Sequence, residues 1–324
     1  MVASRGYVYD IPLRLRFRGI TRRQGMVWET PQGWVEWSPF LDYGLAEAAT
    51  WLRAADEIAQ RGWPKPVRSQ VPVNVTVPAV DPVTAHRLVV ESSCTTAKVK
   101  VAEPGQTLAD DLARVEAVRA ALGPSGRIRV DANGAWDVDT AETALRQLNQ
   151  FDLEYAEQPC PTVPQLADLR RRLRRHDILI AADESIRRSG DPEQVVAAQA
   201  ADIAIIKVQP LGGIWRCLEL AERLKLPVVV SSAIETSIGL AMGLALAAAL
   251  PELPYACGLN TARLLTDDVV TTPLVAQSGQ LPVAVDEAGR PALEPNPAKL
   301  RSVAADEATE QQWRQRLAAA LAIR

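Results

Sequence analysis

The chain has 324 residues, of which 48% are hydrophobic and 23% are charged, as is usual for a globular protein with a large core. This length favours two domains over one. The formal net charge is only −3, which gives no indication of a nucleic acid or an anionic membrane as partner. The four cysteines stand far apart and form no CxxC pair, so we expect reduced thiols rather than a disulfide framework.

The sequence shows no signal for export or membrane insertion. Residues 1–5 are not followed by the apolar core of a signal peptide. The most hydrophobic segment, Ile238 to Leu250, has 13 residues, which is too short to span a bilayer. We therefore expect a soluble, cytoplasmic protein that takes a small-molecule substrate and binds neither nucleic acid nor membrane. Its oligomeric state is not readable from the sequence.

The first 90 residues alternate apolar and polar side chains, as half-exposed antiparallel strands do. We expect strands at residues 7–11, 13–17, 26–30 and 34–37, a loop at Gly19–Gly25, and helices at Leu45–Arg61 and Asp81–Leu88. These elements define an α+β capping domain over residues 1–92. The segment 282–324 is expected to complete it, since Ala305–Ile323 predicts a helix with Trp313 and Leu317 on its buried side.

A second region, residues 93–281, repeats a strand and a helix. The expected strands are Ala97–Val101, Ile128–Val130, Leu153–Ala156, Ile178–Ala182, Ala204–Val208, Pro227–Ser231 and Tyr255–Leu259. The expected helices are Leu108–Leu122, Val138–Gln150, Val163–Arg175, Pro192–Ala200 (with Asp191 as its N-cap), Ile214–Leu224 and Ser237–Ala249. Seven such units favour a closed parallel barrel. An open doubly wound sheet is the alternative, but no Gly-rich phosphate loop follows a first strand.

Three carboxylates stand at the ends of consecutive expected strands: Asp131, Glu157 and Asp183. Each is 26 residues from the next, an interval that fits one strand, one helix and two short loops. Any one of them could simply cap the following helix, but equal spacing on three strands favours a shared site at the barrel rim. Oxygen ligands without His or Cys favour Mg²⁺, with Mn²⁺ also possible, over zinc.

Three lysines accompany the carboxylates. Lys98 and Lys100 are two residues apart on one strand, so both point to the same side of the sheet, and Lys207 stands in the strand expected at Ala204–Val208. These lysines could merely neutralise the carboxylates. Acid–base chemistry is the favoured interpretation, because crowding by cations and burial lower a lysine pKa toward the range of a general base.

These residues in this order resemble the enolase superfamily, specifically its muconate-cycloisomerase-like branch. The matching motifs are Lys98-Val99-Lys100, Asp131-Ala132-Asn133-Gly134, Glu157-Gln158-Pro159, Asp183-Glu184-Ser185 and Ile206-Lys207-Val208. The resemblance implies a modified (β/α)7β TIM-type barrel with an N-terminal capping domain. Within the branch, the segment Val230 to Leu240 and the pair Gly258-Leu259 are most similar to the o-succinylbenzoate synthase family.

The resemblance also implies roles for single residues. Asp131, Glu157 and Asp183 would bind Mg²⁺, Lys100 would be the acid–base catalyst of a syn dehydration, and Lys207 would stabilise the enolate from the opposite face. The expected substrate-binding residues are Lys98, Asn133, Ser231, Ser232, Gly258 and Arg22. Ser231 and Ser232 could instead cap a helix, and Arg22 could belong to a solvated loop.

Two alternatives stay open. A racemase of N-acylamino acids or a dipeptide epimerase would use the same two-lysine site, because it needs a lysine on each face. A non-catalytic, metal-stabilised binding barrel is a more remote possibility.

Overall fold

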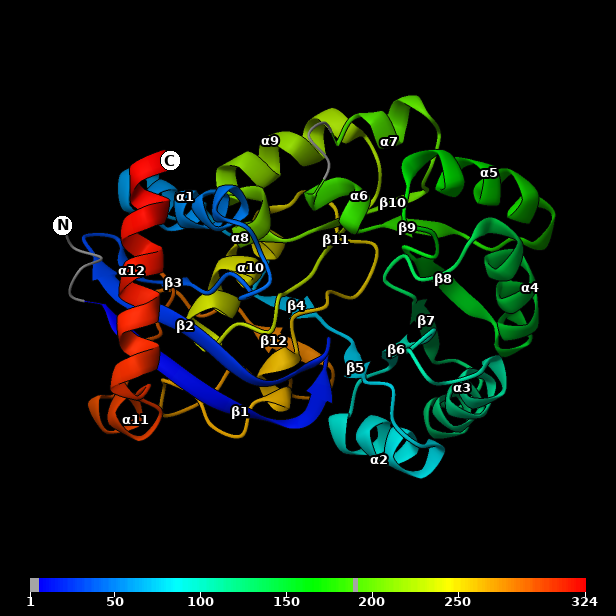
Figure 1. Ribbon diagram of the computed structural model, residues 1–324, viewed down its shortest axis with the longest axis horizontal. Helices are drawn as coiled ribbons and strands as arrows, with labels where there is room; N and C mark the ends of the chain where they lie inside the picture. The colour runs from blue at the N-terminus through cyan, green and yellow to red at the C-terminus, as the bar shows by residue number, and fades with distance from the viewer. Residues whose placement is uncertain (1–5, 189–191) are drawn as a thin grey trace.

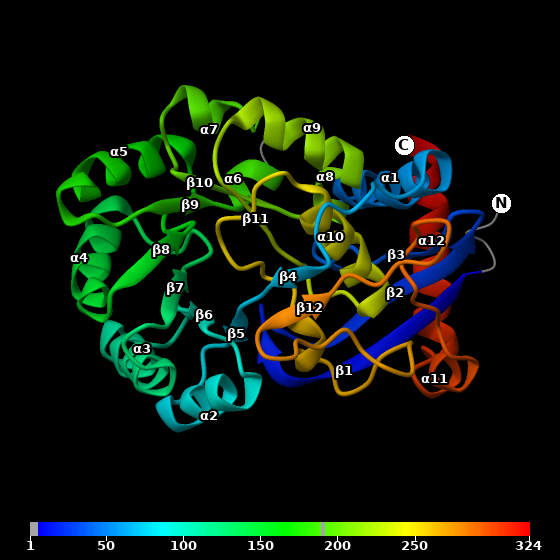
Figure 2. The same ribbon diagram turned by 180° about the vertical axis from the view of Figure 1, so that it is seen from behind.

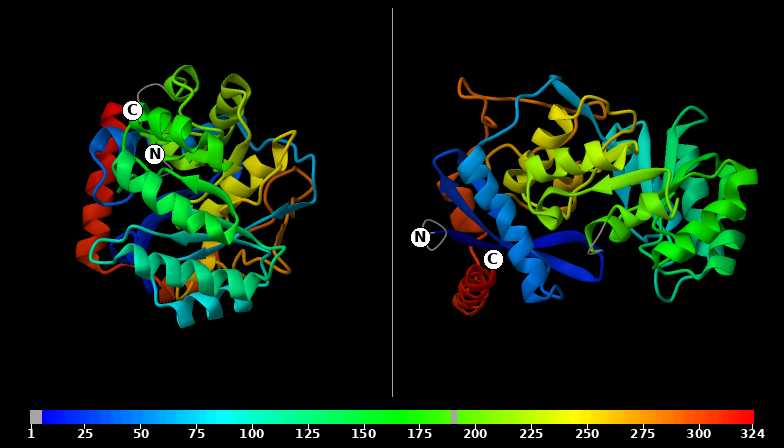
Figure 3. Two further views of the ribbon diagram at one scale, coloured as in Figure 1. Left: turned by 90° about the vertical axis from the view of Figure 1, so that its right-hand side faces the viewer. Right: turned by 90° about the horizontal axis from the view of Figure 1, so that it is seen from above.

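The computed structural model describes residues 6–188 and 192–324. The chain forms a capping domain and a barrel that lie side by side (Figures 1 and 3). The capping sheet is antiparallel in the order β1-β2-β3, formed by Tyr7–Phe17, Ile20–Thr30 and Gly33–Trp37. Helices α1 (Leu45–Arg61) and α12 (Glu307–Ile323) cover it. Trp313 of α12 is buried edge-on against Trp37 at 5.3 Å between ring centroids, so this helix packs on the cap.

The predicted loop at Gly19–Gly25 is wrong. Strands β1 and β2 form one long hairpin that turns at Arg18-Gly19, with Phe17 opposite Ile20. Main-chain pairing with β1 satisfies the backbone of this polar stretch, which its side-chain pattern did not indicate. Gly25 is needed inside the strand, because a Cβ there would meet both the Tyr9 hydroxyl and the Ser38 Cβ at 2.5 Å.

The barrel is a parallel sheet in the order β11-β10-β9-β8-β7-β6-β5. Its strands, from β5 to β11, are Val75–Val77, Thr96–Lys100, Arg127–Asp131, Leu153–Glu157, Ile180–Ala182, Ile203–Ile206 and Val228–Val230. The helices from α2 to α10 are Pro82–Ser92, Leu108–Leu122, Val138–Leu148, Val163–Leu173, Glu184–Arg187, Gln194–Ala197, Val208–Leu211, Ile214–Leu224 and Ser237–Ala249. The helix predicted at Pro192–Ala200 is therefore shorter, and its predicted cap Asp191 lies outside the described residues.

The barrel closes at a position that the sequence placed only approximately. The strand expected at Tyr255–Leu259 is reduced to two parallel bridges, Cys257 with Val73 and Gly258 with Ser231. They join β11 to the start of the sheet beside β5, a strand that the sequence analysis missed. Because β5 and α2 precede residue 93, the parallel sheet begins earlier in the chain than the predicted boundary.

Shorter elements complete the junction between the two parts. Strands β4 (Gln70–Pro72) and β12 (Gln280–Pro282) pair antiparallel there, as Figure 2 shows from behind. Helix α11 (Pro297–Ser302) leads into α12. In the ranges that the structure describes, none of the helices combines the length and apolarity needed to cross a membrane.

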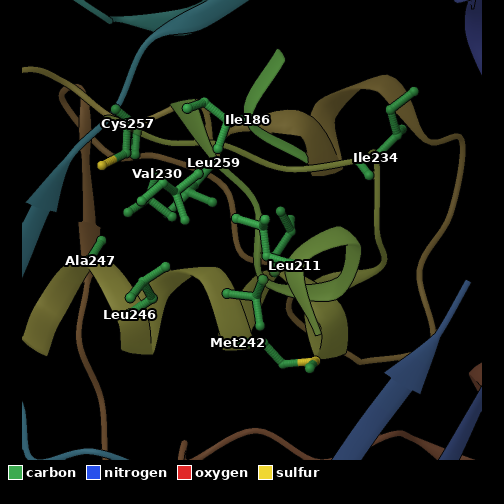
Figure 4. Packing of buried hydrophobic residues seen from close by; sticks show 14 of the residues in the cluster. Ile186, Leu211, Val230, Ile234, Met242, Leu246, Ala247, Cys257 and Leu259 are labelled. Atoms are coloured by element: carbon green, nitrogen blue, oxygen red, sulfur yellow. The ribbon is translucent and has the colours of Figure 1, made fainter. Parts of the chain in front are cut away.

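Two buried layers position the site. Tyr155, Ala181, Ile203, Ile205 and Val229 form an apolar cluster from alternate positions of β8 to β11. Outside the sheet, Leu246 of α10 lies on the side of the helix that faces Val230 (Figure 4). Since side chains alternate along a strand, residues two positions beyond the inner cluster also point into the barrel, at its carboxyl end.

Candidate active site

Strand register brings the predicted charges together. Lys100 lies opposite Asp131 between β6 and β7, and Asp131 lies opposite Glu157 between β7 and β8. Asp183 directly follows β9, and Lys207 directly follows β10. Lys207 was predicted inside its strand, but β10 ends at Ile206 and Lys207 begins the turn into α8. All these positions are at the carboxyl ends of the strands, the rim where barrel enzymes carry their active sites.

The six side chains form two groups of ion pairs on opposite sides of the rim. Lys98 Nζ lies 2.7 Å from Glu157 Oε1 and 3.1 Å from Asp131 Oδ2. Lys100 Nζ lies 2.5 Å from Asp131 Oδ2 and also 2.5 Å from Asn133 Oδ1. On the other side, Lys207 Nζ lies 2.6 Å from Asp183 Oδ2. The side chains of the three carboxylates are each only 1% exposed, so their charges need these partners.

Burial and neighbouring charges shift the acidity of the carboxylates in different directions. Burial, together with the charge of Asp131, raises the pKa of Glu157 to about 7. Burial acts in the same direction on Asp131, but Lys100 and Lys98 outweigh it and hold the Asp131 pKa well below its ordinary value. Arg187 and Lys207 likewise overcome burial and lower the pKa of Asp183. The rim therefore keeps Asp131 and Asp183 ionised.

Lys98 corrects one expectation about the lysines. Burial would lower its pKa, but the charges of Glu157 and Asp131 dominate and raise the pKa above its ordinary value. Because Lys98 is held as a cation between two carboxylates, it acts as a fixed positive charge rather than as a base.

The donor set suits a hard divalent cation in its chemistry. In this conformation, no three carboxylates, thiols or imidazoles among residues 6–188 and 192–324 converge closely enough to hold a metal ion. However, the Asp131 and Glu157 carboxylates already lie within reach of one shared cation, the Lys98 ammonium group. All the candidate ligand atoms are carboxylate oxygens, which Mg²⁺ prefers. The residues therefore fit a divalent metal ion that would replace ammonium groups as the partner of the carboxylates.

A cleft opens above the ion pairs of the rim. Among its lining residues are eight that the sequence singled out: Lys98, Lys100, Asp131, Asn133, Lys207, Ser231, Ser232 and Gly258. Apolar side chains from the cap, including Phe17, Phe40 and Tyr43, form another part of the lining. The cleft thus has charged groups on the barrel side and a partly aromatic cover, as expected for a small organic anion.

Arg22 has a different setting from the one expected. It lies in strand β2 and pairs with Asp10, with Nε 2.8 Å from Oδ1. It lines a wider outer cavity, shared with Asn133, rather than the inner cleft. Its part in substrate binding remains a prediction.

Two arginines that the sequence analysis missed line the inner cleft. The Arg18 guanidinium lies 4.1 Å from the ring centroid of Phe40 and pairs with Asp42 at 3.1 Å. Arg187 Nε lies 2.9 Å from Asp183 Oδ1. The spacing of four residues between Asp183 and Arg187 is a signal that could have been used, because such pairs meet on a helix.

Gln158 was also missed, although it belongs to a quoted motif. Its Oε1 accepts from the backbone N–H groups of Asp183, at 2.9 Å, and Ser185, at 3.1 Å. Its Nε2 donates to Ser185 Oγ and to the Cys160 carbonyl. This fully buried amide fixes the backbone that carries Asp183.

A closed parallel barrel with opposed lysines and carboxylates at its rim, covered by an α+β cap, is the architecture of the enolase superfamily. An enolase C-terminal domain-like model matches residues 83–289, and an enolase N-terminal domain-like model matches residues 8–59. The chain belongs to this superfamily and, within it, to the o-succinylbenzoate synthase family.

Curated relatives support the narrower assignment. The o-succinylbenzoate synthase of Thermobifida fusca is 58% identical over 98% of this chain and 96% of its own length. The o-succinylbenzoate synthase of Mycolicibacterium smegmatis is 48% identical over 99% of this chain and 97% of its own length. Solved structures confirm the fold: 2-chloromuconate cycloisomerase from Rhodococcus opacus has a TM-score of 0.78 at 20% identity, covering 93% of this chain and 98% of that one. An N-succinyl Arg/Lys racemase from Bacillus cereus has a TM-score of 0.75 at 20% identity, covering 93% and 97%.

Proposed function

We propose that this protein is an o-succinylbenzoate synthase. It would remove water from 2-succinyl-6-hydroxy-2,4-cyclohexadiene-1-carboxylate to give 2-succinylbenzoate, a step of menaquinone biosynthesis in the cytoplasm. The observation that carries the proposal is the likeness to a curated synthase at 58% identity over nearly the whole chain. The opposed lysines in the cleft supply the groups that such a dehydration requires.

Lys100 is the proposed acid–base catalyst. Its Nζ reaches the cleft from β6 and is held by Asp131 and Asn133. In its neutral form it takes the proton from the carbon beside the substrate carboxylate. The resulting ammonium group gives a proton to the hydroxyl as its C–O bond breaks, so water leaves and the ring becomes aromatic. Use of one lysine for both transfers makes the elimination syn.

Lys207 is proposed to stabilise the charge that develops on the substrate carboxylate. It lies three strands from β7 and four from β6 in the barrel order, so it faces Lys100 across the cleft. Its positive charge sits in a largely buried setting, where it acts more strongly than in water. Lys98 would assist by its fixed charge.

Asp131, Glu157 and Asp183 are the proposed ligands of a divalent metal ion, Mg²⁺ or alternatively Mn²⁺. When bound, the ion would neutralise negative charge on the substrate carboxylate and so make the neighbouring carbon more acidic. The low pKa values of Asp131 and Asp183 support this assignment, because ligating carboxylates must be ionised.

Ser231, Ser232 and Gly258 are proposed to hold substrate from the far side of the cleft, with Asn133 near Lys100. Gly258 has a physical reason to be glycine, since a Cβ there would meet Ser231 Oγ at 2.6 Å. The absence of that side chain leaves the Ser231 hydroxyl room beside the cleft. Arg22 would act only from the outer cavity.

Turnover of the cyclohexadiene carboxylate tests the proposal directly. We would follow loss of the diene by ultraviolet absorbance, with and without Mg²⁺, for the wild type, Lys100→Ala and Lys65→Ala. Lys65 is an exposed lysine outside the cleft and serves as the matched control. Metal-dependent turnover lost only in Lys100→Ala supports both the reaction and the base. Absence of turnover in the wild type with metal present refutes the reaction, and if metal binding were normal it would favour the racemase.

A racemase or epimerase of N-acylamino acids is the second candidate, because lysines approach the cleft from both sides. Incubation of N-succinylamino acids in deuterated water would discriminate between the two. Deuterium at the α-carbon with inversion would establish the second activity, and no exchange would exclude it for these substrates.

A further inference from the structure

The segment Ser231–Thr236 forms one wall of the cleft, between β11 and α10, and is called the wall segment below. Four of its residues, Ser231 to Ile234, line the cleft. Ile234 has φ of +61°, a left-handed conformation that is unfavourable for a β-branched residue. Such a conformation persists only where the surroundings hold it.

Arg23 of the capping domain provides one of these restraints. Its Nε donates to the carbonyl oxygens of Ala233 at 3.2 Å and Ile234 at 3.1 Å. These two carbonyls belong to the peptide groups on either side of the Ile234 Cα, the strained position. The arginine is 210 residues away in sequence, so this contact joins the cap to the barrel.

The remaining contacts of Arg23 fix its guanidinium in place. Nη1 donates to the Gln24 carbonyl at 2.8 Å, and Nη2 donates to the backbone oxygen of Ser38 and to Ser38 Oγ, the latter at 2.9 Å. The guanidinium carbon Cζ of Arg23 also lies 4.5 Å from the ring centroid of Phe40, which lines the cleft. Arg23 is only 2% exposed, so it bonds protein groups rather than reaching outward to a ligand.

A second cap residue holds the C-terminal end of the wall segment. Glu36 Oε2 accepts from the Thr236 hydroxyl at 2.5 Å, from the Thr236 N–H at 3.2 Å and from the Gly239 N–H at 3.1 Å. Ser38 Oγ donates to Glu36 Oε1 at 2.7 Å and so links Glu36 to Arg23. The middle and the C-terminal end of the wall segment are therefore tied to one buried network of the cap.

We propose that Arg23 is a positioning residue for the cleft: it holds the wall segment, including the strained Ile234, in the shape that faces the ligand. The inference rests on the proposed function in one respect, since Ser231 and Ser232 of this segment are its proposed substrate contacts. Arg23 suits the task because its planar guanidinium bonds two neighbouring carbonyls and Ser38 at once, which a lysine ammonium group cannot reproduce.

Kinetics of Arg23→Lys and Arg23→Gln, compared with Arg14→Lys, test the functional part. Arg14 is an exposed arginine of the same hairpin that bonds one backbone oxygen, and its variant should keep wild-type constants within about twofold. For both Arg23 variants we expect kcat/KM for the diene to fall about 10- to 100-fold, mainly through a higher KM, because the wall is displaced rather than the lysines. The conservative lysine should not rescue the loss.

Amide hydrogen exchange tests the same inference without substrate. Peptides covering the wall segment and the first turn of α10 should exchange about tenfold faster in Arg23→Lys and at the wild-type rate in Arg14→Lys. Unchanged exchange, or faster exchange with an unchanged KM, overturns the positioning role. If the wild type shows no turnover, the proposed function fails, and exchange alone decides whether Arg23 holds the segment.

A milder variant covers the case in which Arg23 substitutions prevent folding. Ser38→Ala removes one acceptor of Arg23 and its link to Glu36 while leaving the arginine in place. It should shift KM and exchange in the same direction by a smaller factor, about two- to fivefold. No shift in either quantity would contradict the proposal.

Discussion

The barrel rim and the interface between cap and barrel both bury carboxylates, but they stabilise them differently. At the rim, Asp131 and Asp183 face lysine ammonium groups. At the interface, Glu36 and Glu57 face backbone N–H groups at the starts of α10 and α9; Glu57 accepts from Trp215 at 3.0 Å and from Arg216 at 3.1 Å. A flexible lysine side chain can move away and let its carboxylate take another partner, whereas the backbone N–H groups at a helix start are fixed in place. The rim is therefore suited to chemistry and the interface to holding the domains together.

Lys207→Ala should show the largest effect, and on activity alone. Loss of one positive charge from the cleft should lower kcat about 100- to 1,000-fold, as removal of a transition-state donor does elsewhere. Asp183 retains Arg187 as a partner, so the melting temperature should change little. Steady-state kinetics and thermal melting of the same sample check this. Strong destabilisation would show that the rim lysine is structural.

Glu36→Ala should behave in the opposite way. It leaves the Tyr9 hydroxyl, the Thr236 N–H and the Gly239 N–H without their buried acceptor. The free energy of unfolding should fall by about 3 kcal/mol, with a smaller loss in kcat than for Lys207→Ala. Urea denaturation measures the first quantity. A normal midpoint would mean that water replaces the carboxylate and that the interface is not rigid.

Asp268 is a buried carboxylate of the barrel that lies at the start of α10, as Glu36 does, and its contribution to stability depends on pH. Its carboxylate accepts from the Ser237 hydroxyl at 2.7 Å, yet burial raises the pKa of Asp268 to about 6. Since the folded state binds this proton more tightly, the contribution of Asp268 to stability is fully present below the unfolded pKa of about 3.9 and is lost as pH rises through about 6.

Asp268→Asn removes that dependence. Between pH 4 and pH 7 the stability of the wild type should fall by about 2 kcal/mol relative to the variant. Urea midpoints at several pH values give the difference. Parallel curves for the two proteins would show that Asp268 keeps the same pKa in both states.

Glu57→Ala should show the smallest effect. Loss of the acceptor at the start of α9 should cost about 1 kcal/mol, as for an N-cap, with kcat and KM unchanged. Glu222→Ala, on the exposed side of the same helix, is the control and should be neutral. A change in KM would show that this contact, like that of Glu36, reaches the cleft.

The sequence predicted the rim far better than the interface. Charges at the ends of buried apolar runs, such as Asp131 and Glu157, are unusual enough to identify a shared site, and strand register then brings them together. Strand β5 was missed because it has only three residues, although Val73, Val75 and Val77 alternate with polar residues between Pro72 and Pro78 and could have indicated it. Arg23 was read as a loop residue because its partners, Ala233 and Ile234, lie more than 200 positions away. Local pattern carries no information about such a contact.

The return of α12 to the cap has a consequence for folding during synthesis. The strands of the cap leave the ribosome before the barrel, whereas Trp313, which is fully buried against Trp37, emerges after it. Until then Trp37 and its neighbours lack their cover. The cap is therefore completed only after the barrel has been synthesised, and the apolar surface around Trp37 lacks its cover until α12 arrives.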